Sequence, residues 1–277
     1  MRFVRSGLLL CFSFLTVPGW GQQAGPPQTP AQAAQAAALM QQSLAAQIST
    51  THINDITLNG NVTVHRGAVT ESGTIILTAL ATGQAKGILT LPSGIRTSFK
   101  NYSVTPRVGT SVGPDGTSTN TPPQELLAPS PAWFFPALIM ASELSSSSGY
   151  AAADMGEETQ AGAMVRHLAI WSTLGGTTTT PTQALQQLGQ QDLYLDPTTL
   201  LPLVLTFNLV GTNPNRNVTP FRKFTAYTPQ EVHFLQYQQV NGLPMAFHIQ
   251  VYIHNTLAMD IQVSSISLNT GATISAN

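Results

Sequence analysis

Residues 192–207, DLYLDPTTLLPLVLTF, place an aspartate and a proline between two runs of large apolar residues. Aspartate at the first position of a tight turn accepts hydrogen bonds from backbone N–H groups just downstream, and proline at the second position presets φ. A catalytic carboxylate would need a partner and a perturbing environment, and the neighbouring residues suggest neither. We therefore interpret Asp196-Pro197-Thr198-Thr199 as a turn that joins two antiparallel strands.

The most regular strand pattern lies further along the chain, in residues 245–253, MAFHIQVYI. Successive residues of a strand point to opposite faces, so one face would carry five apolar side chains, those of Met245, Phe247, Ile249, Val251 and Ile253. Burying them contributes on the order of 7–15 kcal/mol before conformational entropy is subtracted. Another part of the protein must therefore cover this face.

A two-residue period begins at about residue 53 and continues through strands joined by glycine-containing turns. This pattern indicates a meander of antiparallel strands. Residues 107–124, RVGTSVGPDGTSTNTPPQ, are interpreted as a loop-rich stretch. Residues 149–171 resume as two strands around a turn at Gln160–Gly162, and the final third of the chain holds further strands.

Two segments have a helical composition. Residues 31–48 are rich in alanine, with Thr29 as a cap and Pro30 in the first turn, and carry one narrow apolar stripe of Met40, Leu44 and Ile48. Residues 130–148 are strongly apolar and are expected to become helical after Pro136.

A sheet with a single apolar face needs a covering layer, and these two segments are the candidates for it. The sequence therefore predicts an α+β fold, in which an open antiparallel β-sheet is curved into an incomplete barrel and helices cover the concave apolar face.

The N-terminal residues predict export from the cytoplasm. Residues 1–21 combine a basic start, an apolar run shorter than the ~20 residues of a membrane-spanning helix, and small residues before Gln22. This is the pattern of a cleaved signal peptide, with an uncleaved membrane anchor as the alternative. Residues 22–30 are then a Pro/Gln-rich linker, and residues 31–272 form a single β-rich domain that is periplasmic or secreted.

Composition excludes several classes of function. Cys11 is the only cysteine and lies in the predicted signal peptide, so thiol chemistry and disulfides are not expected. Only 8% of residues are charged and no basic run occurs, which argues against nucleic-acid binding. His233, His248 and His254 lack the tight spacing of metal ligands, and we expect neither a metal nor a cofactor.

One motif points to an enzyme. Residues 109–113, GTSVG, match the nucleophile-elbow pattern, so a secreted serine hydrolase using Ser111 is an alternative function. That chemistry needs a helix directly after the serine, whereas Pro114-Asp115-Gly116 indicates a turn. The neighbours Glu157 and Glu158 would point to opposite faces of a strand and could not act together on one substrate.

Residues 132–140, AWFFPALIM, gather aromatic side chains around Pro136. They are either ordinary core, since aromatic residues dominate cores, or a movable plug over an apolar cavity. Combined with the apolar strand face, the second interpretation predicts a ligand-binding set of nine residues: Trp133, Phe134, Phe135, Leu138, Met245, Phe247, Ile249, Val251 and Ile253.

The strands of the last third also resemble those of a known family. LYLDPTTLLPLVLTF is similar to the strand–Asp–x–x–Thr–x–x–Pro–strand hairpin of LolA/LolB-like periplasmic carriers, including the outer-membrane lipoprotein-sorting group. EVHFLQYQQVNGLPMAFHIQVYI resembles their next hairpin, in which Tyr237 ends one strand, Val240-Asn241-Gly242 turns, and Pro244 opens the following strand. The likeness is firm over residues 190–268 and loose over residues 35–105.

This resemblance implies an incomplete antiparallel barrel closed by helices, an apolar interior that takes acyl chains, and no enzymatic activity. Carriers of the LolA type latch their lid with an arginine. Arg66 and Arg96 lie on strands that could do this, but no motif selects either. The chain is longer than compact carriers, and its central insert, residues 105–150, is unlike them.

The leading hypothesis is therefore a non-catalytic periplasmic carrier of an apolar ligand, with a lipid or acylated protein as partner and transient contact with a membrane component. The alternatives are the Ser111 hydrolase and a structural or partner-binding β-domain whose interior is filled. An interior cavity large enough for an acyl chain would distinguish the carrier from the structural domain.

Overall fold

The computed structural model describes residues 29–122, 126, 130–145, 150–172, 189–210 and 227–275. The predicted signal peptide, residues 1–21, and residues 22–28 of the predicted linker lie outside the described residues. Within the described ranges no helix is both long and apolar enough to cross a membrane.

Among the described residues, thirteen strands form one antiparallel sheet in the order β6-β5-β4-β3-β2-β1-β13-β12-β11-β10-β9-β8-β7. Two meanders, β1 to β6 and β7 to β13, therefore meet where β1 pairs with β13. The sheet remains open between its edge strands β6 and β7. The strands are β1 (Asp55–Arg66), β2 (Val69–Leu80), β3 (Gln84–Leu91), β4 (Gly94–Asn101), β5 (Val108–Val112), β6 (Ser118–Asn120), β7 (Tyr150–Gln160), β8 (Ala163–Ser172), β9 (Gln191–Leu195), β10 (Pro202–Val210), β11 (Tyr227–Val240), β12 (Leu243–Ile253) and β13 (Thr256–Leu268).

The predicted turn between β9 and β10 is present. Asp196 Oδ1 accepts from the backbone N–H groups of Thr198 at 3.0 Å and Thr199 at 2.7 Å. These bonds, those from Thr199 foremost, lower the pKa of Asp196 below its ordinary value, against the smaller effect of burial. The Tyr237 hydroxyl on β11 donates to the Pro202 carbonyl at 2.6 Å, so the two hairpins that carry the family resemblance are tied together.

The predicted loop at residues 107–124 is wrong in part, because it contains the hairpin of β5 and β6. Its turn is closed by Gly113 N–H to Thr117 O at 2.9 Å and Gly116 N–H to Gly113 O at 3.0 Å. Gly116 has φ +78°, a conformation that glycine adopts without strain. The alternation of apolar residues is weak here, and backbone pairing with β4 extends the chain instead.

Helix α1 (Pro30–Ile48) begins as predicted, with Thr29 as its N-cap. Thr29 Oγ1 accepts from Gln32 N–H while the Gln32 side chain accepts from Thr29 N–H, which forms a capping box. The buried face of the helix consists of Ala36, Leu39, Met40, Ser43 and Gln47, and Leu44 and Ile48 pack partly buried at its margin.

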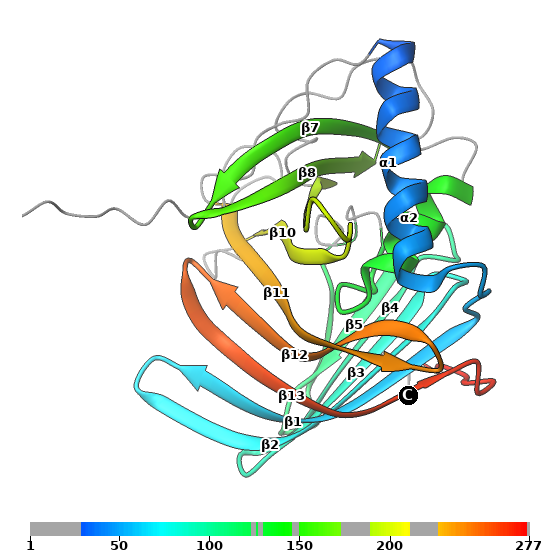
Figure 1. Ribbon diagram of the computed structural model, residues 1–277. Coiled ribbons are helices and arrows are strands. Elements are labelled where there is room, and N and C mark those ends of the chain that lie inside the picture. The colour runs from blue at the N-terminus through cyan, green and yellow to red at the C-terminus, as the bar shows by residue number, and fades with distance from the viewer. Residues whose placement is uncertain are drawn as a thin grey trace, which may run out of the picture.

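Helix α2 (Pro136–Ser145) begins at the proline that the sequence suggested. In Figure 1 the strands curve around α2, and α1 runs across β7 and β8, which it contacts together with β12 and α2. Both helices share the main hydrophobic core with the inward side chains of β1, β2 and β8 to β13. The predicted fold class is confirmed: an open antiparallel sheet forms an incomplete barrel with helices over its concave face.

Candidate ligand-binding pocket

A pocket of about 650 Å³ lies on the concave face over strands β2 to β6. Its volume falls within the ~300–1,000 Å³ that small-ligand pockets occupy. Ile75 and Leu77 of β2 and Leu89 of β3 supply apolar surface, and Ser98 and Ser111 supply hydroxyls. Both serines are exposed, so the pocket is open to solvent.

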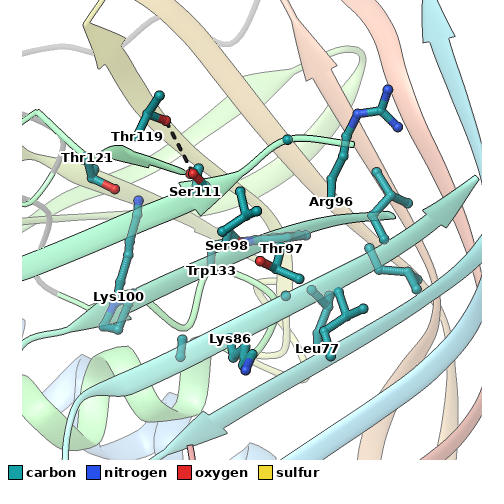
Figure 2. A pocket seen from close by; sticks show the side chains of 18 of the residues that line it. Leu77, Lys86, Arg96, Thr97, Ser98, Lys100, Ser111, Thr119, Thr121 and Trp133 are labelled. Atoms are coloured by element: carbon teal, nitrogen blue, oxygen red, sulfur yellow. Dashed lines mark hydrogen bonds between the residues drawn. The ribbon is translucent and has the colours of Figure 1, made fainter. Parts of the chain in front are cut away.

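Sheet register explains the chemistry of the pocket floor. Leu77 pairs with Gly87, Gly87 with Ser98, Ser98 with Ser111, and Ser111 with Thr119. Directly paired residues point to the same face, so this row changes from apolar at β2 to hydroxylic at β4 to β6. Thr119 Oγ1 also donates to the Ser111 carbonyl at 3.3 Å (Figure 2).

Gly87 has no side chain and therefore leaves space in the middle of this row. A Cβ at that position would lie 2.9 Å from Ser98 Oγ and 3.3 Å from Leu77 Cδ2. A larger side chain at position 87 would therefore occupy the floor of the pocket between these two residues.

The charged residues of the lining are mainly basic. Figure 2 shows Arg96 and Lys100 on β4, on either side of Ser98. Lys86 also contributes to the lining, and its Nζ donates to the Ser275 carbonyl at 3.1 Å. Among the described residues, Asp115 is the one carboxylate in the lining. It accepts from the Thr117 hydroxyl at 2.7 Å and from the Thr117 N–H at 3.0 Å, and these bonds lower its pKa.

The segment before α2 closes one side of the pocket. Pro131, Trp133 and Phe134 belong to the lining, and the rings of Trp133 and Phe134 meet edge to face with centroids 5.8 Å apart. Phe135 N–H bonds to Ala132 O and Leu138 N–H to Phe135 O, so the segment is held in consecutive tight turns.

The nine residues predicted to bind ligand fall into two groups. Trp133 and Phe134 line the pocket. The others belong to the sheet and helices outside the lining: Phe135, Leu138, Met245, Ile249 and Val251 are buried in the main core, Phe247 packs against it, and Ile253 is half-buried at the end of β12. Two of these seven adjoin the lining through the sheet, since Val251 pairs with Met259 and Ile253 with Gln230.

Most lining residues of β3 to β6 were missed in the sequence, where Ser111 was considered only as a nucleophile and Arg96 only as a lid latch. The signal was present in GIRTSFKN, residues 94–101, where Arg96, Ser98 and Lys100 alternate with the opposite face. This face could be assigned to the concave side only from the register, because Gly87 of β3 pairs with both Leu77 and Ser98.

Ser111 lies in the pocket, but in the wrong setting for a nucleophile elbow. It is on strand β5, and the chain continues through a turn into strand β6 rather than into a helix. The carboxylates of Glu157 and Glu158 contact different partners, Arg166 and His167 respectively.

The histidines of β11 and β12 each pair with a separate carboxylate, His233 with Glu231 and His248 with Asp260, both at 3.0 Å. Over the described part of the chain, no group of three or more His, Cys, Asp or Glu side chains could hold a metal ion.

Comparison by sequence finds no matching family model and no matching curated protein. Comparison by structure finds similar proteins, and three of them have a TM-score of 0.51. A putative outer membrane lipoprotein-sorting protein domain from Vibrio parahaemolyticus is 14% identical, with 87% of this chain and 95% of that chain covered. A DUF1329 family protein from Desulfovibrio piger is 12% identical over the same shares.

A LolA superfamily protein from Nitrosomonas europaea is 9% identical, with 84% of this chain and 93% of that chain covered. At these identities the likeness concerns the fold. The chain thus shares an open-barrel fold with these three proteins, and the resemblance found in its sequence is confirmed at the level of the fold.

Proposed function

We propose that this protein is a non-catalytic carrier that binds an apolar ligand, a lipid or the acyl chain of a lipoprotein, in the pocket over β2 to β6. It acts outside the cytoplasm after removal of residues 1–21, and it exchanges its ligand during transient contact with a membrane component. The fold shared with lipoprotein-sorting domains supports this proposal.

The observation that carries the proposal is the pocket itself. Apolar side chains of β2 and β3 and the Trp133–Phe134 pair line a space of about 650 Å³ that is open to solvent. An apolar concavity of this size that also carries a few polar groups is typical of small-ligand sites.

Gly87→Val tests whether the pocket binds ligand. The valine side chain would enter the floor between Leu77 and Ser98, and a β-branched residue suits a strand, so the protein should fold while its pocket shrinks. We expect at least a tenfold loss of affinity for a fluorescent fatty acid, measured by titration, and loss of co-purifying lipid, measured by mass spectrometry of an organic extract.

Thr90→Val is the matched control, since it places the same side chain on β3 at a position of opposite parity that does not line the pocket. It should leave affinity unchanged. Equal affinity of the wild-type protein and both variants, or no lipid in the extract and no uptake of the probe, would argue that the pocket is not a ligand site.

The hydrolase alternative is tested separately. Ser111 is accessible in the pocket, so a fluorophosphonate probe can reach it. A non-catalytic carrier should remain unlabelled at Ser111. Covalent labelling of Ser111, together with an esterase activity that Ser111→Ala abolishes, would favour the hydrolase.

A further inference from the structure

We propose that the pocket selects an amphiphile with an anionic headgroup, bound through Arg96 with Lys100 adding positive charge, while the apolar chain lies against β2, β3 and the Trp133–Phe134 pair. This inference rests on the proposed function and specifies the chemical class of its ligand.

The change from apolar to cationic surface takes place between two adjacent strands. On the concave side, β3 presents Ala85, Gly87 and Leu89, and their direct partners on β4 are Lys100, Ser98 and Arg96. A ligand that lies across the strands therefore meets hydrocarbon at one end and two cations with a hydroxyl between them at the other (Figure 2).

This concentration of positive charge is not a property of the whole protein. The chain has 11 Lys and Arg against 12 Asp and Glu. Among the described residues of the concave side, the pocket lining instead includes Arg96 and Lys100 against the carboxylate of Asp115, which is bound to Thr117 within a turn. Lys86 has the opposite parity on β3, where it pairs with Thr78 and Phe99, and is not counted here. The pocket thus has a positive potential that an anion would complement.

Arg96 is well placed to bind an anion. Its Nη2 donates to Ser93 Oγ at 3.0 Å and its Nη1 lies 3.4 Å from Gly94 O, so both partners are neutral oxygens. In the described ranges the carboxylate of Glu71 forms its ion pair with Arg66 and accepts from the Ser93 hydroxyl at 2.8 Å, so it is linked to Arg96 only through that hydroxyl. A guanidinium has further N–H donors and can bind a carboxylate or phosphate with two parallel hydrogen bonds.

The hydroxyls continue the polar side of the pocket beyond β4. Ser98, Ser111 and Thr119 follow one another across three strands, and all are exposed. The Ser98 and Ser111 hydroxyls can donate to a headgroup oxygen, whereas the Thr119 hydroxyl already donates to the Ser111 carbonyl and can only accept.

The test compares three ligands with the same twelve-carbon chain: dodecanoate, dodecyl phosphate and the uncharged monododecanoylglycerol. Dissociation constants for the full-length mature chain are measured by calorimetry at pH 7.5. We expect the anionic ligands to bind at least tenfold more tightly than the uncharged one, and Arg96→Gln to remove most of that difference. The stronger of the two anions identifies the headgroup as carboxylate or phosphate.

Arg66→Gln is the matched control, because Arg66 lies on β1 outside the lining and should leave the preference intact. A second measurement does not depend on a variant: raising NaCl from 50 to 500 mM should weaken binding of the anions and leave the uncharged ligand unaffected.

If all three ligands bind equally and without salt dependence, the headgroup inference is overturned while the proposed carrier function stands. If none of them binds, both are overturned. A preference for anions that survives Arg96→Gln would also overturn the role assigned to Arg96.

Discussion

Glu143 is an acidic residue inside the layer that covers the sheet. It lies on α2 and its exposed fraction is 7%. Burial raises the pKa of its carboxyl to about 9, and the positive charge of Arg107 offsets only part of that rise. Arg107 itself donates to the Leu126 carbonyl at 2.8 Å and lies over the Tyr102 ring, 4.3 Å from its centroid. Glu143 is therefore protonated at neutral pH.

This protonation makes stability depend on pH. In the unfolded chain Glu143 has its ordinary pKa of 4.5, and in the folded chain its pKa is about 9. At a pH between these two values, the folded state holds a proton that the unfolded state has released. The free energy of unfolding contributed by this group therefore falls as pH rises from about 5 to about 9. We expect Glu143→Gln to remove that contribution, so that its melting temperature increasingly exceeds that of the wild type toward pH 9.

Melting temperatures measured at intervals from pH 5 to pH 9 check this prediction. Glu157→Gln is the control, because 54% of the Glu157 side chain is exposed. Its melting temperature should change with pH in the same way as that of the wild type. If the melting temperature of Glu143→Gln also changes with pH as that of the wild type does, the raised pKa of Glu143 is contradicted.

At the scale of the element, α1 depends on the surface that it covers. In proteins most of the stability of a helix comes from the packing of its apolar face rather than from intrinsic propensity, and α1 has such a buried face. Its buried face contacts β7, β8, β12 and α2, and Ser43 Oγ donates to the Leu200 carbonyl in the turn between β9 and β10 at 2.7 Å. The helix and the Asp196 turn therefore fix each other's position.

Met40→Ala measures this packing. Met40 is 6% exposed on α1 and belongs to the main core, so truncating it should lower the free energy of unfolding by about 2–5 kcal/mol. Gln42→Ala, on the exposed side of the same helix, should change it by less than about 0.5 kcal/mol. Urea unfolding gives both values, and a similar loss in the two variants would show that α1 is not docked as described.

At the scale of the whole molecule, one strand pair joins the two meanders. Ile56 of β1 pairs with Leu268 of β13, so contact between residues far apart in the sequence completes the sheet. Closing so long a segment is slow, since the entropy of closure must be overcome before the contacts form. At Gly60 the register of this pair shifts, and a Cβ there would lie 2.7 Å from the backbone oxygen of Gln262.

Gly60→Ala should therefore separate the two meanders locally and lower the free energy of unfolding by about 1–3 kcal/mol. Gly87→Ala is the matched control, because its Cβ would approach a rotatable hydroxyl, Ser98 Oγ, rather than backbone. Denaturant unfolding of both variants measures the free energy of unfolding. An equal loss of that free energy in the two variants would contradict the close approach of β1 and β13.

Much of the site could not be predicted from the sequence. Trp133 and Phe134 were selected from the composition of their segment, and both lie in the pocket lining. Of the basic and hydroxylic lining residues of β4 to β6, only Arg96 and Ser111 were named, and both for other roles. Pairing of β5 with β4, not an apolar pattern, makes residues 108–112 a strand. The concave side of β4 is defined only through its register with β3.

The sequence by itself determined local structure: the two-residue period of the strands, the Asp196 turn, the cap of α1 at Thr29 and the single apolar face of residues 245–253. These follow from side-chain alternation and backbone hydrogen bonding over a few residues. Only the tertiary structure decided which part of the concave face is filled. The two helices, β12 and the inward side chains of β2 share one core, while a pocket open to solvent remains beside it, from β2 to β6. An apolar pattern specifies that a face must be covered, but whether a gap remains depends on the volume of distant segments that pack against it.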